Sequence, residues 1–279
     1  MRKRLAGWII TAAGIPGVFS LALPAAGQVA KPAAAKARPA PRLPDGHPDL
    51  GNAKGAWAPV VIDDISGNGG GEKEERTRLA QMKLVDQKVD VPFLPWAKEL
   101  YDQRWQTLSK DDPESLCLPP GIPRMMATPF PFQIFQMPDR VVFLFEGGAH
   151  VWRTVYMNRK EHPKEFPQLT FLGDGIGHWE GDTLVIDVAG FNDKTWLDAA
   201  GHPHTDKLHV VERYTREDEM TLHYQATIDD PGAYTKPWII GYKIKWEPGW
   251  EPYEYICQEN NKDVLGGHMF GAKQGEKHP

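Results

Sequence analysis

The alternation of apolar and polar side chains is the feature of this sequence that most constrains its fold. In LHVVERYTREDEMTLHYQATI, residues 208–228, two alternating runs flank the charged turn REDE. Such alternation is typical of a strand with one buried face, and two runs around a short turn predict a β-hairpin. Pairing the apolar faces fixes the register, because a one-residue slip would turn every apolar side chain toward solvent.

Similar runs recur beyond residue 128, rich in Val, Ile, Tyr, Trp and Phe and separated by turns such as NRKE and WEGD. No helical pattern lies between them, so neighbouring strands should pair antiparallel. We therefore predict a mainly β fold: an antiparallel meander of seven or eight strands that closes into a lipocalin-like barrel or folds into a sandwich.

Helical patterns precede these strands at residues 72–88 and 95–110. The second is the clearer one, because it begins with a proline and carries Trp and Leu at roughly helical spacing. We expect both helices to pack outside the barrel or across one end. Together with the strands they form one predicted domain over residues 45–266, followed by a flexible tail at 267–279.

The N-terminal residues are typical of a secretory signal peptide. A basic start, MRKR, precedes an apolar run that Gly and Pro interrupt and small residues follow. We predict a signal peptide at 1–26 and a disordered Ala/Pro/Lys-rich linker at 27–44. The alternative, a transmembrane anchor, is disfavoured by the helix breakers. The expected location is periplasmic or extracellular, without membrane insertion after the signal is removed.

The charge of the chain limits its partners. The formal net charge is −5, and it becomes −8 without the three basic residues of the signal peptide and −12 without the four of the following segment (Lys31, Lys36, Arg38 and Arg42). An acidic body of this size disfavours nucleic acids and anionic membranes. A small molecule is the partner we expect, and the sequence leaves the oligomeric state open.

The chain has two cysteines, Cys117 and Cys257. In an oxidising compartment an even pair most simply forms a disulfide. Two buried free thiols are the alternative. We predict the disulfide and do not assign either thiol as a nucleophile.

The predicted hairpin places one carboxylate, Glu212, on its apolar face together with Tyr214 and Tyr224, while His209 and Arg213 face outward. A buried carboxylate is costly unless it is paired or hydrogen-bonded. Glu212 therefore either holds a loop or a buried arginine, or acts as a general acid/base or metal ligand in a cavity.

The run VVFLFEGGAHVWRTVY carries further candidates. Glu146, His150 and Trp152 share one parity and Arg153 has the other, so Glu146 and His150 face Glu212 unless the two glycines between them break the phase. His178 lies just before the turn WEGD, and Asp187 follows on a strand whose inner face the pattern does not decide. The predicted catalytic residues are Glu212, His150, His178 and Asp187.

The polar stretch FNDKTWLDAAGHPHTD, residues 191–206, is long for a loop within a compact domain and predicts a lid or binding loop. The predicted substrate-binding residues are Arg153, Trp152, Asn192, Trp196, His204 and Tyr224. In extended geometry His202 and His204 would lie on one side of Pro203, so with Glu146 they could bind a divalent metal such as zinc. No HExxH or CxxC motif supports this site, and we expect no other cofactor.

The segments CLPPGIPRMMATPFPFQ, GHWEGDTLVIDVAGFNDKTWLDAAGHPHT and EYICQENNKD, with PDGHPDL near the start, resemble a widespread family of exported bacterial proteins. The resemblance covers about residues 44–264. It implies export and a single β-rich domain, and it assigns no reaction and no catalytic residues.

Two functions follow from these features. The first is an exported enzyme that carries out elimination, isomerisation or hydrolysis by acid/base chemistry in a barrel cavity, with or without a metal. The second is a non-catalytic, lipocalin-like carrier or sensor of an apolar or aromatic ligand, which the ten tryptophans fit equally well.

Overall fold

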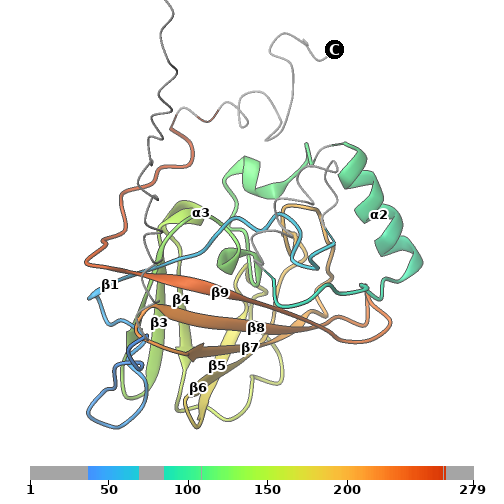
Figure 1. Ribbon diagram of the computed structural model, residues 1–279. Helices are drawn as coiled ribbons and strands as arrows, with labels where there is room; N and C mark the ends of the chain where they lie inside the picture. The colour runs from blue at the N-terminus through green and yellow to red at the C-terminus, as the bar shows by residue number, and fades with distance from the viewer. Residues whose placement is uncertain (1–36, 69–84, 108, 260, 262–279) are drawn as a thin grey trace, which may run out of the picture. The chain divides into compact units, whose positions relative to one another are not determined.

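Nine strands form a closed barrel in the computed structural model, which describes residues 37–68, 85–107, 109–259 and 261 (Figure 1). Each strand pairs with its neighbour in sequence, and the first strand closes the barrel by pairing with both the second and the last. The strands are β1 (Gly55–Ala58), β2 (Phe132–Gln136), β3 (Arg140–Phe145), β4 (Trp152–Tyr156), β5 (Asp174–Glu180), β6 (Thr183–Ala189), β7 (His209–Arg216), β8 (Thr221–Asp229) and β9 (Trp238–Pro248).

The prediction of a mainly β fold that closes into a barrel is confirmed, with two differences. The sequence pattern missed β1, because four residues are too few to show alternation. The meander is also not antiparallel throughout: β4 and β5 pair in parallel, through Val155 with Gly175 and Tyr156 with Ile176. Residues 157–173 return the chain to the other end of the barrel before β5 begins, and this reversal makes the pair parallel.

The interior of the barrel is a packed core. In β7 and β8 buried and partly exposed residues alternate without interruption, as the hairpin pattern predicts. Bulky rings occupy the space that these faces enclose and pack against one another. The buried rings include Phe132, Phe143, Phe145, Tyr214, Tyr224 and Tyr242.

Helices occupy the connections between strands. The helix predicted at 95–110 is α2 (Pro95–Gln106), and it is shorter because Ser109 adopts a left-handed backbone with φ of 54°. One-turn helices are found at η1 (Pro113–Leu116), η2 (Arg124–Met126) and α3 (Gly147–His150). Residues 72–84 of the other predicted helix, most of the predicted N-terminal segments and the tail lie outside the described residues.

Loops and α2 come together at one end of the barrel, where β6 and β8 end and β7 and β9 begin (Figure 1). The backbone N–H of Leu94 donates to Ala233 O (2.8 Å) before β9, and Arg104 of α2 donates to Gly201 O (3.0 Å) before β7. The segment that follows β1 reaches the same place, because Ile65 N donates to Asp198 (3.0 Å). Four separate stretches of chain thus enclose one rim.

The predicted disulfide between Cys117 and Cys257 is confirmed, with the two Cα atoms 5.6 Å apart. It joins the residue after η1 to the segment beyond β9, and it is compatible with an exported protein. Within the part of the chain that the structure describes, no helix is long and apolar enough to cross a bilayer.

Candidate functional site

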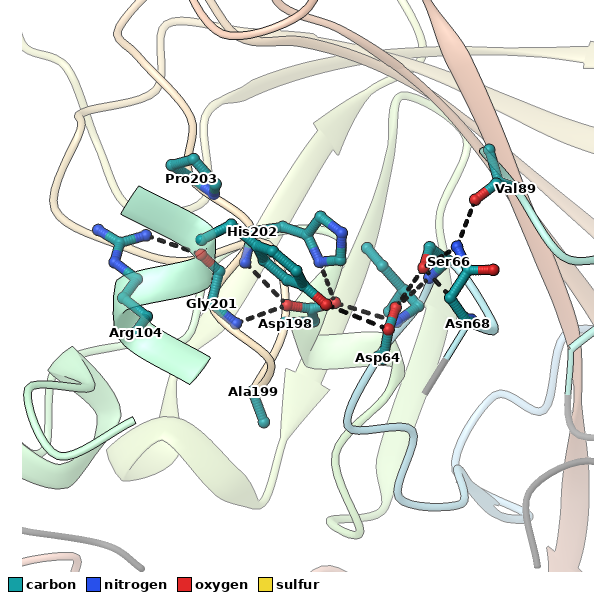
Figure 2. A network of polar contacts seen from close by, with 12 residues as sticks. Asp64, Ser66, Asn68, Val89, Arg104, Asp198, Ala199, Gly201, His202 and Pro203 are labelled. Carbon is teal, nitrogen blue, oxygen red and sulfur yellow. Dashed lines mark hydrogen bonds and ion pairs between the residues drawn. The ribbon is translucent and has the colours of Figure 1, made fainter. Parts of the chain in front are cut away.

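A buried aspartate–histidine pair lies in the loop between β6 and β7 (Figure 2). The ring Nδ1 of His202 is 2.7 Å from Asp198 Oδ2, and both side chains are almost fully buried. The other oxygen of Asp198 accepts the backbone N–H groups of Gly201 (3.0 Å) and His202 (3.1 Å). Asp198 thus fixes both the loop and the orientation of the imidazole, as the carboxylate of a catalytic dyad does.

A second carboxylate, Asp64, lies beside this pair. Its Oδ1 accepts the backbone N–H (2.8 Å) and the hydroxyl (2.5 Å) of Ser66 (Figure 2). Among the described residues, its Oδ2 receives only a long contact of 3.4 Å from the Tyr101 hydroxyl. One oxygen of Asp64 therefore remains weakly bonded. Among the described residues, Nε2 of His202 likewise has no hydrogen-bond partner.

These two groups line a pocket of about 310 Å³ beside α2. Aromatic rings surround the imidazole: Phe93 stacks on His202 with centroids 5.4 Å apart, and Tyr101 lies at 4.5 Å. The remaining lining combines polar and apolar groups, and it includes Asn68, Asp90, Val91, Lys98, Asp102 and Trp105. The pocket could accept a small molecule that has an apolar part and a group able to exchange a proton.

The pKa values of Asp64, His202 and Asp198 are each shifted by burial and by the neighbouring groups. Burial raises the pKa of Asp64, and the nearby charge of Asp198 adds to this effect, against the opposing influence of His202. Burial alone would lower the pKa of His202, but the charge and hydrogen bond of Asp198 outweigh it and raise that pKa. The pKa of Asp198 is lowered, because His202 and the backbone N–H groups outweigh its own burial.

Asp64, Asp198 and His202 offer ligand atoms within 4.8 Å of one another, so a metal ion is the obvious alternative. Hydrogen bonds between described residues already use most of these atoms. Asp198 already accepts four hydrogen bonds, and His202 uses Nδ1 to reach it. Within the part of the chain that the structure describes, one oxygen of Asp64 and Nε2 of His202 remain, which is fewer than the three protein ligands of a typical catalytic zinc site.

Glu212, the main catalytic candidate from the sequence, faces the interior of the barrel as predicted, but it is paired there. Arg153 forms a salt bridge with its carboxylate, and Tyr214 (2.7 Å) and Tyr224 (3.1 Å) donate hydroxyl hydrogen bonds to its Oε1. All four residues are buried. The arrangement matches the structural alternative, in which Glu212 partners a buried arginine.

The inward direction predicted for the face of Glu146 and Trp152 is wrong, because the odd-numbered residues are the buried ones on both sides of α3, in β3 as well as in β4. Trp152 consequently points outward with 67% of its surface exposed, and Arg153 points inward. Glu146 precedes α3 and accepts the backbone N–H of Tyr253 (2.8 Å). His150 is the last residue of α3, so the pattern that directed it toward Glu212 does not hold.

His178 and Asp187 lie on the outside of the barrel, on the opposite face of the sheet from Glu212. His178 contacts Glu180 at 3.2 Å with 59% of its side chain exposed. Asp187 contacts His162 and His209. The structure therefore does not bring the four predicted catalytic residues to one site.

The predicted binding loop is mostly buried. Both ring nitrogens of His204 are engaged, by Thr195 Oγ1 at 2.7 Å and Thr205 O at 3.0 Å, and burial lowers its pKa. The ring of Trp196 lies 4.2 Å from the guanidinium of Arg104. Asn192 caps the next turn by accepting the N–H of Lys194 at 3.1 Å. His202, His204 and Glu146 thus have separate partners and do not form the predicted metal site.

Sequence reasoning missed Asp64, Asp198 and Tyr101. Asp198 stands in the polar loop that was singled out, four residues before His202, and this spacing was a usable signal for the pair. Asp64 and Tyr101 come from segments before the strands, and only the closed fold brings them to the rim.

Comparison with protein families, with curated proteins and with solved structures finds no match to this chain. The function of the site therefore has to be inferred from its own residues.

Proposed function

We propose that this protein is an exported enzyme that transforms a small molecule by acid/base chemistry in the pocket beside α2. The observation that carries the proposal is the placement of Asp64 and His202, two titratable groups with raised pKa values, in the lining of one pocket. Shifted pKa values in a concave site are typical of proton-transfer catalysts.

The directions of the shifts suggest the roles. Asp198 favours the protonated form of His202, so we assign His202 as the proton donor and Asp64, whose pKa is raised by burial, as the proton acceptor. A carboxylate with a raised pKa is a stronger base than an ordinary one. Asp198 touches no substrate in this scheme and is a positioning residue. The reaction classes are elimination, isomerisation and hydrolysis.

Export is part of the proposal. The basic and apolar N-terminal sequence supports it, and the disulfide between Cys117 and Cys257 is compatible with it. The acidic composition supports a small-molecule substrate over a nucleic acid.

A binding protein is the second candidate, favoured by the rings of Phe93, Tyr101 and Trp105 around the pocket. In a carrier these rings would supply the affinity, and Asp64 would provide an orienting charge. Loss of the acid/base pair separates the two functions, because a carrier needs no proton transfer.

The test is a turnover screen of the purified full chain with sugars, aromatic esters and ketones, in parallel with binding followed by tryptophan fluorescence. Asp64→Asn and His202→Gln should each lower turnover by about 100-fold or more, since general acid/base groups contribute about 10²- to 10⁴-fold. His178→Gln, which changes an exposed histidine on the barrel wall, is the matched control and should leave turnover unchanged. Binding without turnover of any compound would favour the carrier.

A further inference from the structure

We propose that the pocket beside α2 binds an organic cation of the substituted ammonium class, held by carboxylates that lack a cationic partner and by aromatic rings. This inference deepens the proposed function and rests on the same pocket, because it names the class of substrate. Three features of the pocket lining support it: the balance of charges, the burial of Asp64 and the arrangement of the rings.

The positively charged groups of the lining are already paired. Among the described lining residues, Lys98 and His202 are the two that can carry a positive charge. Nζ of Lys98 lies 2.7 Å and 2.6 Å from the two oxygens of Asp102, four residues further along α2. Nδ1 of His202 is 2.7 Å from Asp198. Each cation therefore has a carboxylate of its own.

Two other carboxylates line the pocket, and together they leave an excess of negative charge. Asp64 lies beside Asp198 and His202, with ligand atoms of the three within 4.8 Å, so this group carries a net negative charge even when His202 is protonated. Asp90 adds a further negative charge, and it makes no ion pair with another described residue. Such a lining repels an anion and attracts a cation.

The burial of Asp64 makes this imbalance costly. Asp64 has 2% of its surface exposed, and among the described residues its Oδ2 receives only the long contact from Tyr101. A buried carboxylate that is incompletely hydrogen-bonded destabilises the ionised form, and burial accordingly raises the pKa of Asp64. A cation in the pocket would offset this cost and keep Asp64 in the ionised form that accepts a proton.

Aromatic rings in the lining favour an organic cation over a metal ion. The rings of Phe93 and Tyr101 lie 5.3 Å apart and are tilted by 35°. Trp105 follows Tyr101 by four residues in α2, so both side chains lie on the side of the helix that faces the pocket. Aromatic faces attract cations, tryptophan most strongly, and sets of such rings are used to bind quaternary ammonium groups.

The experiment is calorimetric titration of the purified, chelator-treated full chain with choline and with its uncharged isostere, in which a carbon atom replaces the quaternary nitrogen. The two probes share their shape and differ in charge. We expect choline to bind at least about 10-fold more tightly than the isostere, because a desolvated cation gains about this much from an aromatic face.

Two variants test the two parts of the site. Asp90→Asn removes a charge at an exposed position and should weaken choline binding about 2- to 5-fold, as expected for an exposed ion pair, with no effect on the isostere. Trp105→Leu should reduce the preference for choline over the isostere by a similar factor. Glu247→Gln is the matched control, because it removes an exposed carboxylate at the other end of β9 from the rim and should leave choline binding unchanged.

Equal affinity for choline and its isostere would overturn the inference, and so would the absence of measurable choline binding. An unchanged preference in both Asp90→Asn and Trp105→Leu would overturn it as well, since choline would then bind elsewhere.

The turnover screen keeps this failure separate from failure of the proposed function. If Asp64 and His202 turn over a neutral ester or ketone while choline does not bind, only the substrate class is wrong. If choline binds as expected while neither amines nor the other compounds are turned over, the cation site stands and the catalytic function is wrong.

Discussion

Replacing Arg153 with methionine is the sharpest test of how the barrel interior is held together. The guanidinium and the Glu212 carboxylate form a salt bridge with side-chain exposures of 1% and 0%. Methionine keeps much of the length of the side chain but leaves the carboxylate without its counter-charge. Removing one partner of a buried ion pair costs about 3–5 kcal/mol, a large part of the about 5–15 kcal/mol that stabilises a typical domain.

The double variant Arg153→Met/Glu212→Gln should recover most of that loss. The amide oxygen of glutamine can still accept from Tyr214 and Tyr224, and no buried charge remains. Within the described chain, Nε and Nη1 of Arg153 have no hydrogen-bond partner, so the wild-type pair already carries a desolvation cost that the double variant removes.

The assay is urea unfolding of the oxidised protein, followed by tryptophan fluorescence. The free energies of unfolding are compared for variants whose unfolding free energy has the same dependence on urea concentration. A loss below about 1 kcal/mol for Arg153→Met would refute the reasoning, because it would mean that solvent or another group already compensates Glu212. A double variant no more stable than Arg153→Met would refute it as well, since the cost would then come from lost packing.

Three further predictions can be checked on the same protein. Tyr242→Phe should leave the free energy of unfolding unchanged or raise it by up to about 1 kcal/mol, because the buried Tyr242 hydroxyl has no partner among the described residues, whereas Tyr214→Phe should lower it by about 1 kcal/mol in the same urea assay. The paired replacement of Cys117 and Cys257 by alanine should cost at most about 5 kcal/mol, since the bridge spans 140 residues, and the urea midpoint measures the loss. The stability that His202 contributes should be fully present below its unfolded pKa near 6.5 and be lost as pH rises through its higher folded pKa. The difference in unfolding free energy between wild type and His202→Gln should therefore be larger at pH 5.5 than at pH 9. An equal difference at the two pH values would contradict the raised pKa.

The sequence carried enough information to predict the wall of the barrel where strands are long and one face is buried. The alternation in residues 208–228 predicted the inward direction of Glu212 and Tyr224 and the outward direction of His209, because a two-residue period leaves no other choice once one face is apolar. The same reasoning failed in VVFLFEGGAHVWRTVY, because the apolar run VVFLF does not show which of its faces is buried. The odd-numbered residues, Arg153 among them, face inward, and Trp152 faces outward.

The candidate pocket was harder to predict, for a reason of distance along the chain. Asp64 and Asp198 are 134 residues apart, and each stands in a loop with no periodic pattern to orient it. Their proximity depends on the closing of the barrel, which β1 completes, and β1 is itself too short to recognise from the sequence. The Asp198–His202 spacing could suggest a pair, but not what it faces.

The difference between the interior of the barrel and its rim is the reason that we place the proposed chemistry at the rim. Inside the barrel the carboxylate of Glu212 forms a salt bridge with Arg153 and accepts hydrogen bonds from two tyrosines. A ligand there would have to displace these interactions, which stabilise the fold. At the rim Asp198 is equally saturated, but it holds His202 so that one ring nitrogen remains, next to one weakly bonded oxygen of Asp64. Among the described residues, the rim thus holds one weakly bonded oxygen and one ring nitrogen beside a pocket. Proton transfer requires such a combination, and a carboxylate sealed in a packed core cannot supply it.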